Sequence, residues 1–508
     1  WSLGIMGLFN KPIDIMTVLL PTIMFVVGMS DVIHIMSRYI TEIGQGVTKV
    51  QALRTTLREV GLATLLTSLT TSVGFLTLLT TSIVPIREFG FYTAISIFLA
   101  FVLAFTVLPA ILLLIKRPNP RRALRIDFSW PIQLRRLYSF VLRKPKPILY
   151  ASMAIVVVSM LGISLIRVDT TLLEDLGDDD PVIKDFQYFE EKFSGVRPFE
   201  LHLMAAPGKT MYDLEVLQEI DKIETYLYQD YGLNFITSPA TVVRTINRAL
   251  NGGFNNFYTL PESRQSMQQV RRRLDAFNKR DELRSVVTAD QMEGRLAGKM
   301  TDVGSVRAAE LNDSLKLFID QHINPQLLQT RLTGSAVMLD KNNEYVVSNM
   351  MQGLLIAFLV VAILVGIIFR SLRMVVISLV PNIIPLLMIG GIMGFLGINM
   401  TVSVSIIFTI AFGIAVDDTI HFLGKLKLEL RQGKSLPYAI KRTIISAGKA
   451  IIITSCILVA GFLTLVLSSF DGTFYVGVFV SLTLLLAVVA DLLLLPVLIL
   501  YFYKPDRK

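Results

Sequence analysis

The 508-residue sequence has little cysteine, little histidine and little charge. Its single cysteine, Cys456, excludes a disulfide framework within the chain and any zinc site made of several cysteines. Only four histidines occur, and charged residues make up 18% of the chain. Because disordered chains and coiled coils are rich in charged residues, this composition excludes both classes.

Apolar residues are what the sequence has in excess, since 53% of the chain is hydrophobic and the mean hydropathy is +0.58. Several apolar runs reach the roughly 20 residues that a helix needs to cross the ~30 Å hydrocarbon layer of a membrane. The net charge of +9 could suggest a nucleic-acid partner, but lysine and arginine fall mainly in short segments between the apolar runs. The sequence therefore predicts a polytopic α-helical membrane protein that binds no nucleic acid.

The apolar runs predict nine complete spans, and residues 1–9 are expected to be the end of a tenth. The predicted spans are 13–36, 60–81, 89–115, 148–166, 347–369, 374–396, 401–424, 450–468 and 474–502.

Basic residues predict the orientation of these spans. The segment 116–147 contains ten lysines or arginines and one acid, Asp127, which by the positive-inside rule makes it cytoplasmic. Counting spans from there places segments 38–59 and 425–449 on the same side. Their apolar residues have helical spacing, so each is expected to lie as an amphipathic helix along the membrane surface.

The polar segment 167–345 then lies on the opposite side, outside the cytoplasm, and is long enough to be a domain. Its residue patterns predict strands that alternate with helices. The predicted strands are 197–206 and 328–334, and the predicted helices are 214–228 and 305–322. Such an alternation suggests an α+β domain of the split βαβ kind.

The two ends of the chain repeat each other without a gap when one end is shifted by 387 residues. GIMG occurs at Gly4–Gly7 and at Gly391–Gly394, and GFLTL occurs at Gly74–Leu78 and at Gly461–Leu465. Both copies cross the membrane in the same direction, so a pseudo-twofold axis is expected along the membrane normal. Because the span at 148–166 should also have a counterpart, the intact protein is expected to be longer and to have twelve spans.

The spans and the repeat together predict the order of domains. The chain should run through the spans of the first repeat (1–115), a basic cytoplasmic linker (116–147), the first span of the second repeat (148–166), an extracytoplasmic domain (167–345) and the remaining spans of the second repeat (346–508).

Acidic residues and histidines occur together inside two of the predicted spans. Asp31 precedes His34 by three residues, and Asp418 precedes His421 in the same way, with Asp417 as an additional acid. This spacing puts carboxylate and imidazole on one helical face. A charged group at the bilayer centre costs ~2.5–3.5 kcal/mol on insertion scales, which favours a functional role such as a proton relay. The alternative is that these groups only bond to one another and hold the two spans together.

Further polar residues belong to the same predicted centre. Thr454 and Ser455, with repeat counterparts Thr67 and Ser68, could relay protons or could bond to carbonyls of their own helix. Asp491 has no charged counterpart, and it is either a third relay acid or a packing acid near a kink. Two aspartates and two histidines could also form a metal site, but no further ligand is evident in the sequence, so no metal is predicted.

These motifs resemble the resistance-nodulation-division (RND) superfamily of transporters. The resemblance rests on GIAVDDTIHF at Gly413–Phe422, on LVPNIIPLLMIGGIMGFLGIN at Leu379–Asn399, and on an external α+β domain after the first span of a repeat. The chain is more similar to the MmpL-like branch, which exports hydrophobic molecules and is related to Patched and the sterol-sensing proteins, than to the drug pumps. Unlike the drug pumps, it has its acidic pair, Asp417 and Asp418, in the second half and lacks an intramembrane lysine.

The resemblance implies proton-driven export of hydrophobic or amphiphilic molecules. It also implies that the protein lies in a bacterial inner membrane, with its α+β porter domain in the periplasm. It implies protons as the coupling ion, no cofactor, and membrane lipids and a hydrophobic substrate as partners. It is compatible with a homo-oligomer. Docking to an outer-membrane channel is not expected, because the external domain is too short to include a docking subdomain. The implied proton-relay residues are Asp31, Asp417, Asp418 and Thr454, with His34, His421, Thr67, Ser455 and Asp491 in support.

Two other functions fit the same resemblance. One is a lipid-sensing or sterol-sensing receptor of the Patched type, and the other is an accessory subunit that uses proton flow to move proteins across the membrane. An enzyme is not predicted, because the sequence shows no nucleophile with a base, phosphate loop or HExxH pattern. For the transporter, spans 13–36 and 401–424 are expected to pack against each other with Asp31 and Asp418 facing across the interface.

Overall fold

The computed structural model describes residues 1–14, 16–81, 83–116, 130–173, 176, 180–278 and 283–503. The chain forms two compact units, one made of residues 1–168 and 344–508 and the other of residues 169–343. Among the described residues of the first unit, nine helices are long and apolar enough to cross a membrane, which confirms a polytopic helical membrane protein. Of the predicted basic linker, residues 117–129 lie outside the described residues.

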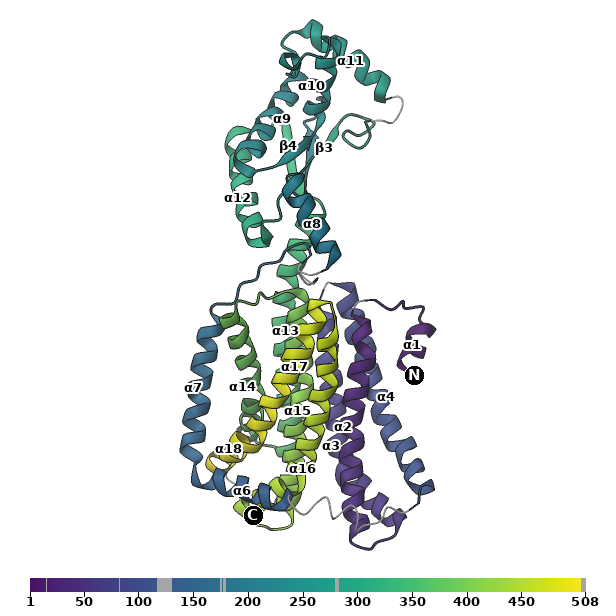
Figure 1. Ribbon diagram of the computed structural model, residues 1–508, viewed down its shortest axis with the longest axis vertical. Coiled ribbons are helices and arrows are strands. Elements are labelled where there is room, and N and C mark those ends of the chain that lie inside the picture. The colour runs from purple at the N-terminus through teal and green to yellow at the C-terminus, as the bar shows by residue number, and fades with distance from the viewer. Residues whose placement is uncertain are drawn as a thin grey trace. The chain divides into compact units, whose positions relative to one another are not determined.

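The membrane unit contains one series of helices from each repeat (Figure 1). The first series is α1 (Ser2–Leu8), α2 (Leu20–Gly44), α3 (Lys49–Leu76) and α4 (Val84–Leu114). A short helix, α6 (Trp130–Arg143), follows. The second series is α7 (Pro145–Ile163), α13 (Ser335–Phe369), α14 (Leu372–Leu396), α15 (Val402–Arg431), α16 (Leu436–Leu463), α17 (Asp471–Val489) and α18 (Leu495–Phe502).

The two series match each other in their bounds and in their hydrogen bonds. Helices α3 and α16 begin and end at positions 387 residues apart. Ser72 Oγ donates to the Ala94 carbonyl at 3.2 Å, and Ser481 Oγ donates to the Val459 carbonyl at 3.3 Å. Ser72 corresponds to Val459 and Ala94 to Ser481, so the two bonds join the same pair of repeat positions. The position that donates in one repeat accepts in the other. The two repeats thus pack their helices in the same way.

The expectation that segments 38–59 and 425–449 form separate helices along the membrane surface is wrong. The long helices extend through both segments and are joined by short turns. Each turn contains a glycine with positive φ, Gly46 at 91° and Gly433 at 76°, which glycine adopts without steric cost. Tyr39 is buried in a cluster with residues of α3 and α4, so its segment packs against protein and not against lipid.

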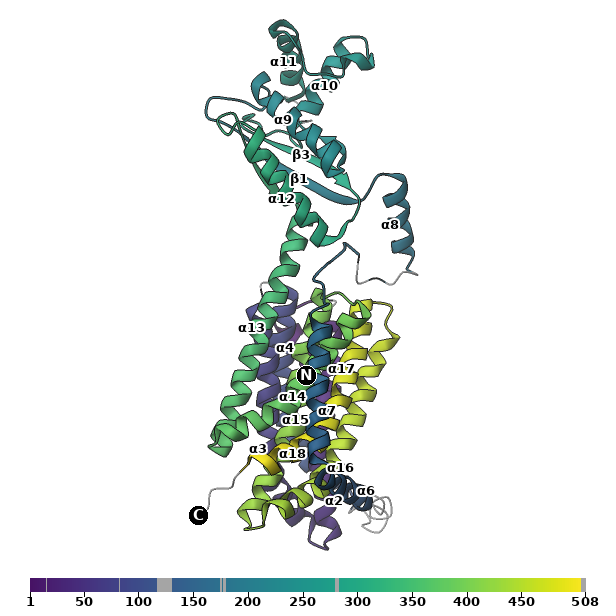
Figure 2. The same cartoon turned by 90° about the vertical axis from the view of Figure 1, so that its left-hand side faces the viewer.

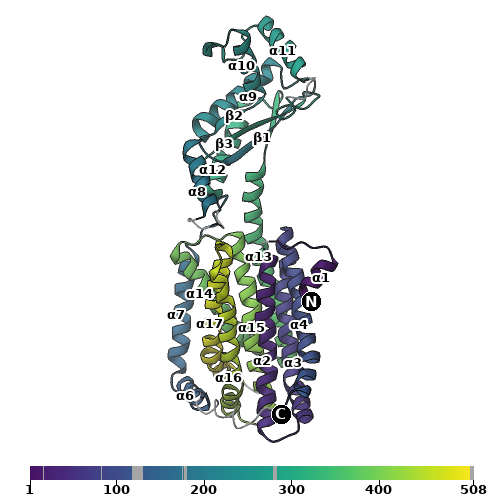
Figure 3. The same cartoon turned by 45° about the vertical axis from the view of Figure 1, so that its right-hand side comes forward.

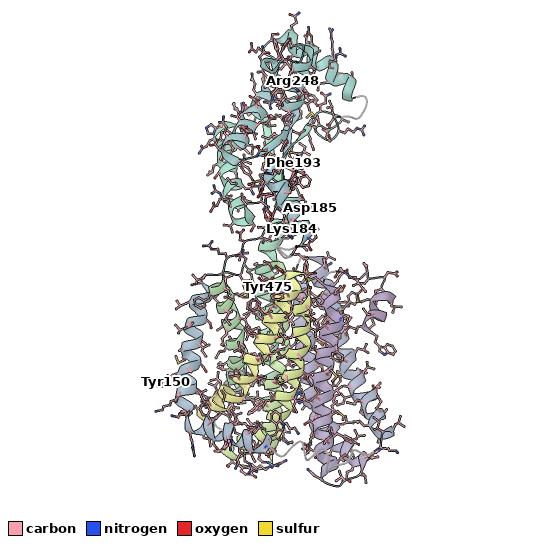
Figure 4. All side chains as sticks on the ribbon, in the orientation of Figure 1. Tyr150, Lys184, Asp185, Phe193, Arg248 and Tyr475 are labelled. Atoms are coloured by element: carbon pink, nitrogen blue, oxygen red, sulfur yellow. The ribbon has the colours of Figure 1, made fainter. Side chains whose placement is uncertain are left out.

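Helix α15 is the central helix of the membrane unit. It packs against α3, α14, α16 and α17, and Figures 1 and 3 show it between helices of both repeats. In its most apolar window 94% of the residues are buried, compared with 11% for α7. On α7 the side chain of Tyr150 points away from the other helices (Figure 4). Peripheral helices such as α7 therefore expose apolar side chains to lipid, whereas the polar residues in the most apolar part of α15 are buried among the other helices.

The second unit is an α+β domain with a four-stranded antiparallel sheet. The strands are β1 (Arg197–Ala205), β2 (Asn234–Thr237), β3 (Glu293–Met300) and β4 (Leu328–Thr333), in the sheet order β2-β3-β1-β4. The helices are α8 (Pro181–Lys192), α9 (Leu214–Tyr226), α10 (Pro239–Leu250), α11 (Arg264–Asn278) and α12 (Gly304–His322). Helices α9 and α12 follow β1 and β3, which gives the strand order of a split βαβ unit, with α10 and α11 added between β2 and β3.

One face of this sheet carries the core of the domain. Phe199, Leu201 and Leu203 alternate along β1 and are buried in one cluster with residues of α9 and α12. The two helices lie side by side, since Tyr226 and Phe318 stack with ring centroids 4.3 Å apart (Figure 3). The period-two pattern of β1 therefore buries one face, as expected for an antiparallel sheet covered on one side.

A buried arginine connects β1 to other elements of the same domain. Arg197 donates to Asp302 at 2.8 Å and to Asp340, at the beginning of α13, at 2.5 Å. Burial alone would lower the pKa of Arg197, but the hydrogen bonds and charges of the two carboxylates outweigh burial and raise it. A buried cation is retained only with such partners.

The repeated GIMG motif allows close packing of two helices. Its second copy places Gly391 and Gly394 on α14, which runs beside α7 (Figure 2). A Cβ added to Gly394 would lie 1.8 Å from the carbonyl oxygen of Gly162, and one added to Gly391 would lie 2.7 Å from the Cα of Ser159. Small residues let helix backbones in a membrane approach this closely.

We expect Gly394→Ala to lower the melting temperature of the purified protein, because overpacking typically costs ~1–3 kcal/mol. Gly7 is the counterpart of Gly394 in the first copy, and a Cβ added there has no neighbour within 4 Å. Gly7→Ala is therefore the matched control and should melt like the wild type. Equal melting temperatures for the two variants in detergent would contradict the close contact of α7 and α14.

Candidate functional site

Five ionisable side chains lie buried where helices of the two repeats meet. Asp31 and His34 come from α2, and Asp417, Asp418 and His421 come from α15. Their exposed fractions are between 5% and 7%. The structure thus brings together the acids and histidines that the sequence singles out, inside helices long and apolar enough to cross the membrane.

Two contacts cross directly from one repeat to the other. Ser30 Oγ donates to Asp417 Oδ2 at 2.8 Å. The imidazole rings of His34 and His421 stack with their centroids 3.7 Å apart and their planes 8° apart. In both contacts the partners are 387 residues apart, so each residue meets its own repeat counterpart on the pseudo-twofold axis.

Two further contacts stay within one repeat. Ser68 Oγ donates to Asp31 Oδ2 at 3.3 Å, and its counterpart Ser455 donates to Asp418 Oδ2 at 2.8 Å. The expectation that Asp31 and Asp418 face each other across the interface is therefore wrong. Adjacent residues of a helix project about 100° apart, so Asp418 points toward α16 while Asp417 occupies the interface.

Asp417 also lies beside an imidazole of its own helix. His421 Nε2 is 3.3 Å from Asp417 Oδ1, four residues earlier on α15. This is an ion-pair distance without hydrogen-bond geometry. Asp417 therefore contacts both repeats at once: Ser30 of the first and His421 of the second.

The threonines next to the two serines bond to their own helices. Thr454 Oγ1 donates to the carbonyls of Ala450 and Ile451, and Thr67 Oγ1 donates to the carbonyl of Thr64. Both threonines are buried. Of the two roles considered for these threonines, proton relay or bonding to their own helix, the structure shows the second: each hydroxyl donates to a carbonyl of the preceding turn.

Asp491 joins the site through a chain of hydrogen bonds that exists in the second repeat only. Asn382 Nδ2 donates to Thr419 Oγ1 at 2.9 Å, and Thr419 Oγ1 donates to Asp491 Oδ1 at 2.6 Å. Asp491 lies in a π-helical turn, Ala490–Leu494, between α17 and α18. Such turns are frequent at functional sites. Because Thr419 follows Asp418, Asp491 is a neighbour of the central acids.

Several buried polar atoms of this cluster have no hydrogen-bond partner among the described residues. They are His34 Nε2, Asn382 Oδ1, Asp417 Oδ1, Asp418 Oδ1, His421 Nε2 and Asp491 Oδ2. Buried polar atoms in proteins are normally paired, and each unpaired one calls for an explanation. A site that gains and loses protons provides one, because each protonation state satisfies a different set of atoms.

Three of these side chains also offer atoms that could bind a metal. One ligand atom each from His34, Asp417 and His421 lies within 4.8 Å of the others. Imidazole and carboxylate suit several divalent metals. The same three groups would be neighbours in a proton relay, so the expectation that the site holds no metal stays a prediction.

Two ion pairs, which lie near the C-terminal ends of α2 and α15, were not predicted from the sequence. Arg38 contacts Glu42 at 2.5 Å, and the repeat counterparts Lys425 and Glu429 contact at 3.4 Å. Glu59 lies 2.9 Å from Arg38 and 3.9 Å from Lys425. The signal in the sequence is a pair of opposite charges four residues apart that occurs in both repeats.

A helical membrane bundle of two parallel repeats, with acids buried where the repeats meet, is the architecture of a secondary transporter. The model of the MMPL family matches residues 11–148 and 249–504. The chain belongs to the MMPL family of the RND superfamily, whose members are transporters, which confirms the resemblance. A protein of Methanocaldococcus jannaschii named "Putative membrane protein MJ1562" is 22% identical over 374 residues, which are 72% of this chain and 93% of that protein.

We expect a disulfide to form between Ser30→Cys and Asp417→Cys in a Cys456→Ser background, because the two side chains are in direct contact. Mass spectrometry of the linked peptides after mild oxidation measures it. Ser30→Cys with Asp418→Cys is the control and should link much less, since Asp418 bonds to Ser455 of its own repeat. Equal linking in both variants would contradict the placement of Asp417 at the interface.

Proposed function

We propose that this chain is a proton-driven exporter of hydrophobic or amphiphilic molecules, lipid-like or drug-like, in a bacterial inner membrane. One observation carries the proposal: the carboxylate of Asp417 accepts a hydrogen bond from Ser30 of the other repeat and lies beside His421. A change in the charge of Asp417 therefore changes a contact that joins the repeats. Membership of the MMPL family supports transport of hydrophobic substrates.

Proton uptake would change this interface in a definite way. An ionised Asp417 accepts a charge-assisted hydrogen bond from Ser30, and a neutral carboxyl accepts a weaker one. Asp31 and Asp418 are buried in the same region and each accepts one serine hydroxyl. Like charges repel strongly where water is excluded, so the three carboxylates are not stable when all are ionised.

These carboxylates can therefore act as the proton carriers of the transporter. When one of them takes up or releases a proton, the relative stability of two arrangements of the repeats changes, and a proton gradient can drive movement between them. Asp491 supports the carriers through Thr419. The histidines are neighbours that adjust the charge balance at the axis.

The α+β domain would form the periplasmic, substrate-handling part of the exporter. The positive-inside rule supports this orientation, because the basic segment 116–147 and the segment 425–449 fall on one side and the domain on the other. The split βαβ order of its strands supports the α+β fold expected of a porter domain. The substrate would reach this domain from the membrane.

We expect Asp417→Asn and Asp418→Asn each to abolish amphiphile-dependent proton flux in reconstituted vesicles. Asparagine keeps the size of aspartate and can still accept a hydrogen bond through its carbonyl oxygen, but it cannot ionise. His421→Gln should reduce flux less, because imidazole has a supporting role only. A pH-sensitive dye inside the vesicles, with a fluorescent phospholipid added as the amphiphile, reports the flux.

Two controls separate this proposal from a purely structural role. Interhelical hydrogen bonds are typically worth only ~0.6 kcal/mol, so if the acids merely hold helices together, the asparagine variants should transport almost normally. Melting temperatures show whether each variant folds. Flux that persists with asparagine at positions 31, 417 and 418 together would end the relay proposal, and flux that stops when a chelator is added would contradict the prediction of no metal.

A further inference from the structure

A large cavity lies between the two repeats at the basic ends of the central helices. Its volume is about 1320 Å³, and residues of α2, α3, α6, α13, α15 and α16 line it. His34 and His421 are lining residues, so the cavity begins at the stacked histidine pair. Its wall contains repeat counterparts such as Arg38 and Lys425, which places it on the pseudo-twofold axis. We call it the cationic cavity.

Cations outnumber acids on the wall of this cavity. Five arginines and three lysines line it, and Glu59 is the only acid among the described lining residues. Glu59 is already shared between Arg38 and Lys425. Four lining arginines form no ion pair with a described acid: Arg54, Arg58, Arg135 and Arg431. The wall therefore has a large excess of positive charge.

The positive-inside rule does not account for this arrangement by itself. Basic residues at the cytoplasmic ends of spans satisfy that rule equally well when they point outward to the lipid headgroups. Here arginines of α3, α6 and α15 converge on one cavity. Arg54, Arg58, Arg135 and Arg431 are exposed, so water screens their repulsion in part, and an anion between them would add charge-assisted hydrogen bonds.

We propose that the cationic cavity binds the phosphate group of an anion. The guanidinium fork of arginine matches the oxygens of phosphate and can form two parallel hydrogen bonds with it. Arg54 and Arg58 lie four residues apart on one face of α3, and Arg135 and Arg431 approach from other helices. Three helices thus supply a set of donors that could surround one phosphate group.

Two sources of phosphate fit this chemistry. The wall also contains apolar residues, among them Leu62, Leu66 and Phe369, along which an acyl chain could lie. Basic pockets between membrane helices bind the headgroups of anionic lipids in this way. A soluble phosphate would use the arginines alone. None of the four unpaired arginines belongs to the proposed proton relay, so the two proposals can fail independently.

The cavity contains a natural reporter. Trp130 of α6 is a lining residue, and the sequence has two tryptophans, Trp1 and Trp130. In a Trp1→Phe background, the emission of the full chain reports on the cavity alone. One arm of the experiment uses phosphatidylcholine nanodiscs with a rising fraction of phosphatidylglycerol. The other arm uses pure phosphatidylcholine nanodiscs and titrates inorganic phosphate.

We expect a saturable change of Trp130 emission in at least one arm. In the variant with Arg58→Gln and Arg135→Gln, the anion concentration at half-saturation should rise about thirtyfold. This value follows from ~1 kcal/mol for each of the two basic residues that contact the anion. Arg54→Gln with Arg431→Gln is a second variant, needed if the first fails to fold. The matched control is Arg136→Gln with Arg442→Gln, because these arginines of α6 and α16 are exposed like the four cavity arginines but do not line the cavity.

The outcomes distinguish the sources and can overturn the proposal. A response to phosphatidylglycerol alone assigns the cavity to a lipid headgroup, and a response to inorganic phosphate alone assigns it to a soluble anion. A response in both arms supports binding of the phosphate group itself. The proposal is overturned if neither arm gives a saturable change, or if the control variant weakens the response as much as the cavity variants do.

Discussion

Carboxylates and imidazoles inside a membrane need partners, and here Asp417 and the two histidines find theirs in the other copy of an internal repeat. Asp417 of the second repeat takes its hydrogen bond from Ser30 of the first, and His421 stacks on His34. Asp31 and Asp418, in contrast, bond to serines of their own repeats, so it is the contacts of Asp417 and of the histidine pair that require both repeats. The central position of α15 and the close packing of the helices around it serve this one requirement.

Much of the fold could be predicted from the sequence, because apolar spans and an internal repeat that aligns without a gap are strong signals. The membrane helices, the acids Asp31, Asp417 and Asp418, and two of the four strands of the α+β domain, β1 and β4, could be located in advance, whereas β2 and β3 were not predicted. Which acid faces the other repeat could not be predicted, since adjacent residues project about 100° apart and the helix rotation is set by packing. The link from Asp491 to Thr419 depends on a π-helical turn, which has no simple sequence pattern.

The two repeats share their architecture but differ in their chemistry. The repeat counterpart of Asp417 is Ser30, and that of Asp491 is Ala104. The second repeat therefore contains more buried aspartates than the first. The serine that binds each of the other acids, by contrast, is present in both repeats. In the proposed relay, three of the four buried aspartates, Asp417, Asp418 and Asp491, would belong to the second repeat and one, Asp31, to the first.

The most direct test of this account asks whether the buried carboxylates change protonation while the protein works. Infrared difference spectroscopy of the reconstituted protein detects the carbonyl stretch of a protonated carboxyl group when the pH or the amphiphile concentration is changed. The account predicts a carboxyl band that appears and disappears with these changes in the wild type and that is lost in the triple asparagine variant at positions 31, 417 and 418. A wild-type spectrum with no carboxyl band under any of these conditions would contradict it.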